Sequence, residues 1–353
     1  MQTNSFLLYG ANGYTGQLIT ELAVSYGLQP ILAGRSEGAI RSMAEQYNLP
    51  YRIADLNNRE ALQKALEGVS LVLHAAGPFK YTAKPMIAAC LANGVHYTDI
   101  TGEIEVFEMA KQYGEGAKEA GVMVMPGVGY DVVLTDCLAL FLKQQLWDAY
   151  KLKLAFATLG GRVSHGTAST LIEGLGEAGA VREHGVIVRK PVGHKGMWVN
   201  FGSKNLFTMT IPWGDVSTAF YTTGIPNIEC YAAAPRLVYY LMKLQKVFNP
   251  LLRIEAVRTF FKKRIKNRPA GPSAAERKNS KSLIWGEVLN KNGERVKGKL
   301  TCADGYTLTA HSSLIIAKKI LNGQFKTGYQ TPAGAFGADL ILEVPGSVRT
   351  LVQ

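Results

Sequence analysis

The sequence predicts an α/β protein: a doubly wound parallel sheet at the N-terminus, followed by a second, mixed α+β domain. Short apolar runs alternate with helical patterns over residues 1–125, and longer β-type runs begin near Pro126. Such alternation is typical of parallel strands joined by right-handed helical crossovers. We expect a first domain at 1–125, a second at 126–330, and a C-terminal segment at 331–353 whose helix packs back on the first domain.

The strands of the first domain are expected where short apolar runs lie between helical patterns. We expect them at 6–9, 31–33, 51–53, 71–74, 97–100 and 122–125. The intervening helical patterns cover 16–26, 39–47, 60–66, 85–92 and 105–120. Strands joined by helices in this rhythm indicate a sheet with helices on both faces.

The second domain reads differently because its β-type runs are longer. We expect strands at 151–158, 186–190, 206–211 and 228–232, with one helix at 166–180. Asn292-Gly293 favours a type I′ hairpin turn, and two helices, 308–321 and 333–342, are expected near the C-terminus.

Composition excludes several classes of protein. The chain has 353 residues, of which 47% are hydrophobic and 19% charged, so it is neither disordered nor collagen-like. Its four cysteines are scattered, which argues against a zinc site or a disulfide framework. The six histidines show no ligand spacing, and we expect no metal.

The first strand is followed by a glycine-rich turn that opens a helix. In Gly10-Ala11-Asn12-Gly13-Tyr14-Thr15-Gly16, each glycine has its own use. Gly10 allows a sharp turn, Gly13 lets backbone amides approach a pyrophosphate, and Gly16 allows close packing of helix on strand. We predict that Gly10, Asn12, Gly13, Tyr14, Thr15 and Gly16 contact a dinucleotide. A glycine-rich turn with no ligand is the alternative.

The end of the second strand indicates which dinucleotide binds. Gly34-Arg35-Ser36 stands where NAD sites usually carry an acidic residue for the ribose 2′-hydroxyl. An arginine fork with a nearby hydroxyl suits a 2′-phosphate instead. We therefore predict NADP(H), with a solvated surface arginine as the alternative. Asp55, after the third strand, is expected either to accept from the adenine amino group or to cap the next helix.

Small and polar residues follow the fourth and fifth strands. Ala76-Gly77-Pro78-Phe79 leaves room for a cofactor to cross the sheet edge, and Thr101-Gly102-Glu103 offers contacts near the nicotinamide. After the sixth strand, Pro126-Gly127-Val128-Gly129-Tyr130-Asp131 forms a loop that could reach the reacting ring. Tyr130 and Asp131 are our candidate catalytic residues, because Tyr can donate a proton and Asp can orient it or act as a base. A helix cap is the alternative for Asp131.

Several of these motifs together resemble the saccharopine dehydrogenase-like oxidoreductases, in particular the branch of the trans-acting enoyl reductases and saccharopine dehydrogenase-like proteins. The resemblance rests on segments 7–16, 33–36, 76–79, 97–103 and 126–131, and it extends to 164–169, 271–273, 285–287 and 331–336. It implies an NADP-binding Rossmann domain followed by a mixed α/β domain. It also implies a reductase acting on a C=C bond of enoyl or acyl type, or on a C=N bond, at the domain cleft.

Two other functions stay open. A saccharopine-type amino-acid dehydrogenase would need cations for its substrate's carboxylates, and Arg162, Arg182 and Arg189 are available. A non-catalytic, membrane-associated NADP-binding protein is the other alternative. His165 could donate a proton, although Ser164 or Thr167 capping a helix there is the stronger interpretation.

The net charge of +12 comes from one block: residues 236–299 hold 17 Lys or Arg and four acidic residues. Within it, the apolar and basic stretch 235–266 indicates either peripheral membrane contact or ordinary packing. We expect no nucleic-acid binding, because the aromatics match no known module. Residues 1–5 show no secretion leader, so we expect a cytoplasmic protein, with a peripheral position at a membrane as the alternative. We expect a small-molecule substrate, with acyl or lipid-like compounds as one candidate class. Exposed strands of the second domain are compatible with a homodimer.

Overall fold

A computed structural model describes residues 5–266 and 269–352 of the chain. Most of the segment 1–5, on which the expectation of no leader rests, and residues 267–268 of the basic block lie outside the described residues. The chain forms two compact units. The first unit comprises residues 1–133 and 306–336, and the second comprises 134–305 and 337–353.

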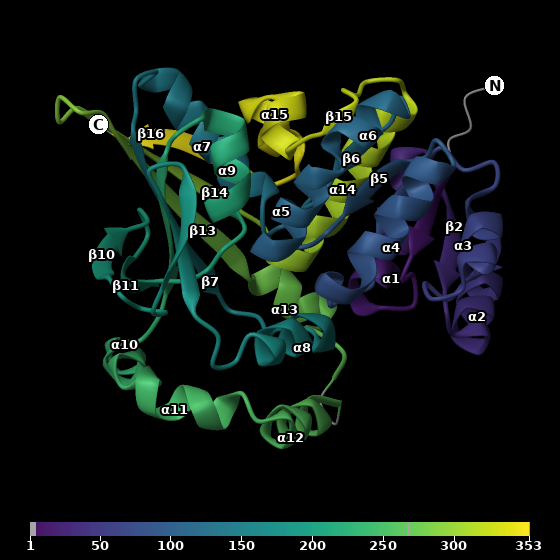
Figure 1. Ribbon diagram of the computed structural model, residues 1–353, viewed down its shortest axis with the longest axis horizontal. Coiled ribbons are helices and arrows are strands. Elements are labelled where there is room, and N and C mark those ends of the chain that lie inside the picture. The colour runs from purple at the N-terminus through teal and green to yellow at the C-terminus, as the bar shows by residue number, and fades with distance from the viewer. Residues whose placement is uncertain (1–4, 267–268, 353) are drawn as a thin grey trace. The chain divides into compact units, whose positions relative to one another are not determined.

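The first unit is built on a seven-stranded parallel sheet with the strand order β15-β6-β5-β4-β1-β2-β3 (Figure 1). Its strands are β1 (Ser5–Tyr9), β2 (Gln29–Gly34), β3 (Tyr51–Ile53), β4 (Leu71–His74), β5 (His96–Asp99), β6 (Met123–Met125) and β15 (Gly328–Tyr329). All six strands expected from the sequence are present. β1 lies between β2 and β4, so the chain reverses its winding direction there, which confirms the doubly wound sheet.

The helices of the first unit connect these strands, and two of them come from the C-terminal part of the chain. They are α1 (Tyr14–Ala23), η1 (Val24–Tyr26), α2 (Glu37–Tyr47), α3 (Arg59–Leu66), α4 (Phe79–Ala92), α5 (Ile104–Gln112), α6 (Gly114–Glu119), α14 (Gly305–Leu321) and α15 (Pro332–Phe336). The sheet's core is apolar, with Phe6, Leu7, Leu8 and Tyr97 fully buried.

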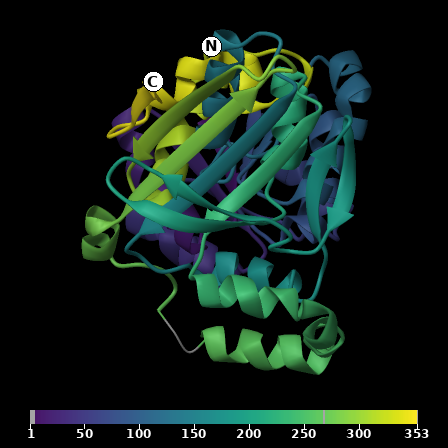
Figure 2. The same cartoon turned by 90° about the vertical axis from the view of Figure 1, so that its left-hand side faces the viewer.

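The second unit is built on a mixed sheet in which β10-β11-β12-β7-β13-β14-β16 form one path and β8 and β9 branch from β12 (Figure 2). The strands are β7 (Lys151–Leu159), β8 (Gly179–Glu183), β9 (Val186–Lys190), β10 (Gly196–Asn200), β11 (Asn205–Thr210), β12 (Asn227–Ala233), β13 (Lys281–Leu289), β14 (Arg295–Cys302) and β16 (Val348–Val352). This mixed sheet confirms the α+β second domain that the sequence predicts.

The helices of the second unit are α7 (Val133–Gln145), α8 (His165–Glu173), α9 (Asp215–Thr223), α10 (Arg236–Lys243), α11 (Gln245–Leu252), α12 (Glu255–Lys266), α13 (Ala274–Asn279) and η2 (Ala338–Glu343). Helix α7 packs on β13 and β14 opposite two glycines. A Cβ on Gly286 would lie 2.7 Å from Leu142, and one on Gly298 would lie 3.1 Å from Leu138. Among the residues that the structure describes, no helix combines the length and apolarity that crossing a membrane requires.

The C-terminal part differs from the expected organisation. We expected a segment returning to the first domain at 331–353, but the segment that clusters with the first unit is 306–336. Residues 337–353 cluster with the second unit, where β16 pairs with β14. Gly337 separates the two parts with φ 88°, so the helix expected at 333–342 breaks into α15 and the 3-10 turn η2.

Other local expectations also needed correction. The helix expected at 166–180 ends at Glu173, because Gly176 takes φ 79° and β8 begins at Gly179. The predicted hairpin joins β13 to β14, but its loop spans Asn290–Glu294, closed by the Asn290 N–H donating to the Glu294 carbonyl (3.1 Å). Gly293 has φ 89° whereas Asn292 is not left-handed, so the turn is not type I′.

Candidate cofactor site

The residues predicted to bind a cofactor all follow strands of the first unit's parallel sheet. Because parallel strands end at the same edge, the structure brings these loops together along the carboxyl edge. They are Gly10–Gly16 after β1, Gly34–Ser36 around the end of β2, Asp55 after β3, Ala76–Phe79 after β4, Thr101–Glu103 after β5, and Tyr130 and Asp131 beyond β6. We refer to this set as the carboxyl edge.

The glycine loop after β1 has a backbone that side chains would obstruct. Gly10 has φ 88°, and a Cβ there would lie 2.8 Å from the Cβ of Ala76. A Cβ on Gly16 would lie 2.4 Å from the Gly10 carbonyl oxygen. The Gly10 N–H donates to the Ala33 carbonyl (2.8 Å), which fixes the loop against β2. The loop therefore requires glycine at both positions whatever it binds.

Gly13 and the start of α1 are arranged differently. Gly13 is exposed, and a Cβ there would meet only the Gly10 carbonyl oxygen, at 3.2 Å. It is the N-cap of α1 and offers no side-chain hydrogen bond to the helix. A helix N-terminus reached by exposed glycine backbone suits an anionic group, because the first amides and the helix dipole point at it. These residues fit the pyrophosphate of a dinucleotide.

Arg35 and Ser36 are exposed directly after β2. Ser36 is the N-cap of α2, but its side chain makes no capping hydrogen bond. The Asn12 side chain from the glycine loop lies over Gly34, with its Oδ1 3.4 Å from the position of a Gly34 Cβ. The glycine loop and the Arg35–Ser36 pair are therefore adjacent, as the two ends of an adenosine phosphate would require.

The charges of Arg35 and Asp55 both act on the hydroxyl group of Tyr9. The pKa of Tyr9 is raised to about 12, mainly by burial and also by the Asp55 carboxylate, while the Arg35 guanidinium opposes both. Asp55 Oδ1 accepts from the backbone N–H of Asn57 (2.8 Å), while Asn58 supplies the N-cap of α3. Asp55 therefore forms a turn before the helix and is not its cap.

Glu103 holds the start of α4. Its Oε1 accepts from the Phe79 N–H (2.8 Å), and its Oε2 accepts from the Lys80 N–H (2.9 Å). This is the reason that α4 begins at Phe79, six residues before the helix expected from the sequence. Burial raises the pKa of Glu103 although these two hydrogen bonds lower it. Glu103 thus positions the Ala76–Phe79 segment as well as lying at the edge itself.

Asp99, at the end of β5, ties the neighbouring loops together. Its buried carboxylate accepts from the Thr101 N–H and the Gly127 N–H, both at 2.9 Å, and from the Tyr97 hydroxyl at 2.7 Å. Burial raises the pKa of Asp99 to about 6, although the hydrogen bonds lower it. Asp99 has a structural role: it sets the position of the loop that carries Tyr130 and Asp131.

Asp131 lies against Gly102. A Cβ on Gly102 would stand 2.4 Å from Asp131 Oδ2, so only glycine leaves room for this carboxylate. Burial raises the pKa of Asp131 to about 7, and the Glu103 carboxylate contributes in the same direction. A carboxyl group with a pKa near 7 can give or take a proton at neutral pH. Asp131 is thus chemically the best suited of the candidate acids.

His74, at the end of β4, is not suited to proton transfer. It is fully buried, and burial lowers its pKa to about 3. Its ring packs near those of Tyr9, Phe79 and Tyr97, with centroid distances of 5.4, 5.3 and 6.3 Å. His74 therefore acts as a neutral aromatic packing residue beneath the carboxyl edge.

Sequence reasoning did not identify the contacts that α14 makes with the loops of the carboxyl edge. Thr309 Oγ1 accepts from the Tyr130 N–H (3.0 Å), and the Ser312 hydroxyl donates to the Val128 carbonyl (2.8 Å). Tyr306 meets Tyr14 of the glycine loop edge to face, with centroids 5.0 Å apart. The helix itself was expected, but nothing in the sequence pairs residues some 180 positions apart.

The candidate residues of the second unit have structural roles. Ser164 caps α8 by accepting from the Thr167 N–H (3.3 Å), which confirms the capping interpretation of the segment around His165. Arg182 is buried and donates to the carbonyls of Val216 and Gly185 (2.7 and 2.6 Å).

Two further arginines were considered for binding substrate carboxylates. Arg162 pairs with Glu276 at 2.9 Å. Arg189, on β9, is exposed. Together with the buried Arg182, this means that two of the three arginines already have partners within the second unit.

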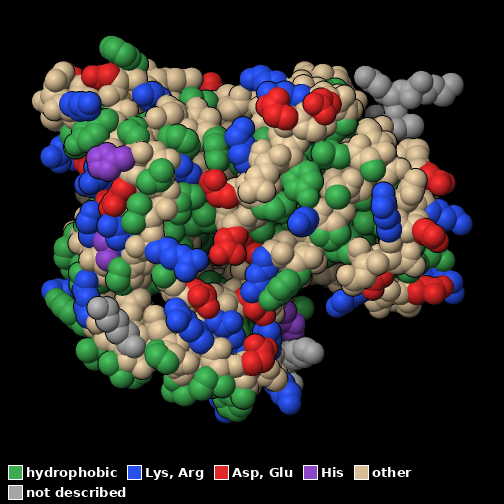
Figure 3. Space-filling view, in the orientation of Figure 1, with side chains coloured by type: hydrophobic (Ala, Val, Ile, Leu, Met, Phe, Trp, Pro, Cys, Tyr) green, Lys and Arg blue, Asp and Glu red, His purple; other side chains and the backbone are tan. Residues whose placement is uncertain are grey.

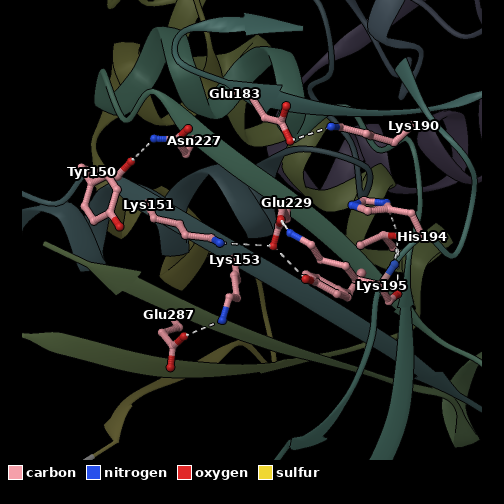
Figure 4. Close-up of polar contacts among 12 residues, drawn as sticks. Tyr150, Lys151, Lys153, Glu183, Lys190, His194, Lys195, Asn227, Glu229 and Glu287 are labelled. Carbon is pink, nitrogen blue, oxygen red and sulfur yellow. Dashed lines mark hydrogen bonds and ion pairs between the residues drawn. The ribbon is translucent and has the colours of Figure 1, made fainter. Parts of the chain in front are cut away.

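A second polar cluster lies on the sheet of the second unit (Figure 4). Glu287 pairs with Lys153 (3.1 Å), and Glu229 pairs with Lys151 (3.8 Å) and with Lys195. Burial raises the pKa of Glu229, but hydrogen bonds from Lys195 and from Tyr231 lower it overall. Both carboxylates are buried and paired with lysines, so the cluster joins neighbouring strands.

Comparison with known proteins finds a family-model match within the first unit. Residues 6–125 match the family model of the saccharopine dehydrogenase NADP binding domain. The chain is also similar over its whole length to the solved structure of apo histidine-tagged saccharopine dehydrogenase (L-Glu forming) from Saccharomyces cerevisiae. That likeness has a TM-score of 0.68 at 12% identity and covers 99% of this chain and 100% of that one. At this identity it shows the fold alone.

Several curated relatives, among them the following three, match part of the chain. The mouse saccharopine dehydrogenase-like oxidoreductase is 28% identical over 53% of this chain and 49% of its own length. The Caenorhabditis elegans lipid droplet localized protein is 30% identical over 52% and 49%, respectively. The Mycobacterium leprae trans-acting enoyl reductase is 30% identical over 37% and 33%. The matches span about half the length of the first two relatives, so activity, substrate and partners are matters of proposal.

Proposed function

We propose that this protein is an NADPH-dependent reductase. Residues 6–125 match the family model of the saccharopine dehydrogenase NADP binding domain, and part of the chain is similar to the saccharopine dehydrogenase-like oxidoreductases. The observation that carries the proposal is the carboxyl edge. There, a glycine loop whose Gly10 and Gly16 have no room for a side chain lies beside the exposed Arg35 and Ser36. This pairing suits a pyrophosphate and a 2′-phosphate on one ligand.

Each candidate residue would have a separate task. Gly10, Asn12, Gly13, Tyr14, Thr15 and Gly16 would surround the pyrophosphate, Gly34, Arg35 and Ser36 the 2′-phosphate, and Asp55 the adenine. Ala76, Gly77, Pro78, Phe79, Thr101, Gly102 and Glu103 would lie along the nicotinamide half. When bound, NADPH supplies a hydride to an electron-poor carbon.

The chain itself would supply the proton that completes the reduction. Asp131, with a pKa of about 7, would donate it to the other atom of the reduced C=C or C=N bond. Tyr130 would help to orient the substrate. Reduction then adds one hydride and one proton across the double bond, and the two electrons come from the dinucleotide.

The substrate that we favour is an enoyl or acyl-type compound. One relative carries the name trans-acting enoyl reductase. A saccharopine-type substrate would need cations for several carboxylates, whereas Arg182 is buried against backbone carbonyls and Arg162 pairs with Glu276. These contacts favour the apolar substrate class over the amino-acid alternative.

We also propose a cytoplasmic location with peripheral contact to a lipid surface through residues 235–266. The support is the exposed apolar and basic character of this stretch, together with one relative that is named a lipid droplet localized protein. Copies of the chain could pair through exposed strands of the second unit. Sedimentation velocity would show whether they do.

The test of the cofactor site is the affinity for NADPH and NADH, measured by calorimetry for the wild type and Arg35→Asp. We expect NADPH to bind more tightly to the wild type. The substitution should weaken NADPH binding roughly 10- to 100-fold, because charge-assisted hydrogen bonds to the 2′-phosphate are lost. NADH binding should change little.

The matched control is Lys64→Asp, since Lys64 is an exposed cation of the first unit in the last turn of α3, away from the carboxyl edge. It should leave both affinities unchanged. If the wild type binds neither nucleotide, the reductase proposal is wrong. If Arg35→Asp and Lys64→Asp behave alike, the NADP preference does not come from Arg35.

A further inference from the structure

We propose that the three consecutive helices α10, α11 and α12, residues 236–266, dock on the surface of an anionic phospholipid layer. We call this segment the arm. Figures 1 and 2 both place it at the lower edge of the second unit. The inference rests on the peripheral contact proposed above and names the residues, the orientation and the lipid chemistry.

The polar side chains of the arm hold it to its own unit. The buried Gln245 side chain donates to the Val192 carbonyl (2.8 Å), and its oxygen accepts from the Val192 N–H (3.2 Å). Arg253 donates to the Gly176 carbonyl (2.9 Å), and Arg258 donates to the Leu175 carbonyl (2.8 Å). The orientation of the arm is therefore fixed by hydrogen bonds to two loops of the second unit.

The apolar side chains of the arm point the other way. Leu237, Tyr240, Leu241 and Leu244 are exposed at the spacing i, i+3, i+4, i+7. The same spacing then repeats as Leu244, Val247, Phe248 and Leu251, so the stripe continues from α10 into α11. Leu237 is 70% exposed and Val247 is 73% exposed. An amphipathic helix at a protein surface normally buries its apolar face against the rest of the protein. The arm instead exposes this apolar face to its surroundings.

The charge of the arm indicates what covers this stripe. Residues 236–266 contain nine Lys or Arg and a single acidic residue, Glu255. In α12, Phe260 and Phe261 are exposed beside Lys263 and Arg264, and the Arg264 guanidinium lies 5.4 Å from the Phe260 ring centroid. Figure 3 shows hydrophobic and basic side chains gathered together along this lower edge.

An apolar stripe with a basic border is complementary to acyl chains and anionic headgroups. Two copies of the arm facing each other would instead bring two strongly cationic segments together, which is unfavourable. The observations therefore favour a lipid layer over a second copy of this chain as the partner.

The experiment is a flotation assay with vesicles of phosphatidylcholine alone, or of phosphatidylcholine with about 30% phosphatidylserine. We expect the wild type to bind the mixed vesicles more tightly. A triple variant, Leu237→Ser, Leu244→Ser and Val247→Ser, should lose at least about tenfold in affinity for both vesicles, because apolar area no longer enters the layer. Lys263→Glu with Arg264→Glu should lose mainly the preference for phosphatidylserine.

Matched control variants remove exposed apolar side chains or basic charges elsewhere in the second unit. Val186→Ser, Val348→Ser and Leu351→Ser delete exposed apolar side chains of β9 and β16, and Lys291→Glu with Arg295→Glu reverses two charges at the β13–β14 hairpin. Both control variants should bind vesicles as the wild type does. Arm variants that bind like their controls would overturn the proposal. So would a wild type that binds no vesicle but forms a dimer that the triple variant dissociates.

NADPH affinity, measured on the same arm variants, separates this proposal from the reductase. It should be unchanged, because the arm belongs to the second unit. A wild type that binds vesicles but no dinucleotide would leave the arm proposal standing and remove the reductase. A wild type that binds the dinucleotide but no vesicle would leave the reductase proposal standing and remove the arm proposal.

Discussion

The carboxyl edge of the first unit and the arm of the second unit are both surfaces that the fold leaves uncovered, but they are built in opposite ways. The shape of the carboxyl edge depends on close backbone packing. Gly10 and Gly16 have no space for a Cβ, and the buried Asp99 carboxylate accepts hydrogen bonds that fix the neighbouring loops. The arm depends on its side chains: exposed apolar residues recur at the spacing i, i+3, i+4, i+7 along one helical face.

Because of this difference, we expect the two surfaces to respond differently to mutation. A site made by close backbone approach fails when one added atom has nowhere to go, because the neighbouring carbonyls cannot rotate away as a side chain can. A surface made of separate apolar side chains loses affinity in steps, because each contributes its own buried area. Mutations in the carboxyl edge should therefore abolish or preserve binding, whereas mutations in the arm should weaken binding in proportion to the apolar area that they remove.

The largest combined effect, on both stability and NADPH binding, is expected from Gly16→Ala, because the new Cβ would lie 2.4 and 2.6 Å from the carbonyl oxygens of Gly10 and Ala11. We expect a loss of about 1–3 kcal/mol in the free energy of unfolding, as for other overpacked sites. NADPH binding should fall at least about tenfold, since the loop must shift. Urea unfolding and calorimetry measure the two quantities.

The matched control is Gly38→Ala in α2, where a Cβ would meet no atom within 4 Å. It should keep NADPH affinity and stability or raise the stability slightly, since alanine is the better helix former. Equal behaviour of the two alanine variants would show that the loop is not as tightly constrained as the geometry indicates. Gly13→Val complements the pair: Gly13 is exposed, so this change should abolish NADPH binding at a smaller cost in stability.

The next prediction concerns stability, through the pH dependence caused by Asp131. Its folded-state pKa of about 7 lies above the ordinary value of 3.8, so between these pH values the folded protein holds a proton that the unfolded chain has released. Stability therefore falls as pH rises from about 4 to about 7, and the full penalty is present above pH 7. Asp131→Asn should remove this penalty, on the order of 2–4 kcal/mol at pH 8 and little at pH 4.

Urea unfolding at several pH values measures this, with the exposed Glu45→Gln of α2 as the control for losing one surface carboxylate. A parallel shift of the Asp131→Asn curve at every pH would show that the carboxyl group titrates normally. The same variant should lose proton donation in the reductase, so the two readouts bear on one residue through independent properties.

The carboxyl edge was predictable from the sequence because its determinants are local. Gly10 to Gly16 and Arg35 lie within one βαβ unit, and parallel topology then places every strand end at one edge. The contacts that position the edge were not predictable. Glu103 binds the start of α4, and Thr309 binds the Tyr130 amide, each across a separation that no local pattern reveals.

The arm shows the complementary limit of sequence reasoning. Its apolar spacing and its charge were visible, but a helical stripe that packs inward and one that points outward have the same sequence pattern. The side on which Gln245, Arg253 and Arg258 find backbone carbonyls decides between the two, and these partners lie 53 to 83 residues away along the chain. The direction in which the apolar face points therefore depends on tertiary contacts that the sequence periodicity does not reveal.

The smallest effect expected is from single substitutions in the arm, and it tests directly whether this surface is graded. Leu244→Ser and Val247→Ser should each weaken vesicle binding by roughly three- to tenfold, as partial burial of one apolar side chain implies. The double variant should show the product of the two factors, because the two side chains contribute separate areas.

Neither substitution should change the free energy of unfolding by more than about 0.5 kcal/mol, since both side chains are more than half exposed in the folded protein. A single substitution that abolishes binding outright would mean that the arm, like the glycine loop, is a shaped site for one ligand. In that case the distinction between the two surfaces would fail, and a specific apolar ligand should be sought in place of a lipid layer.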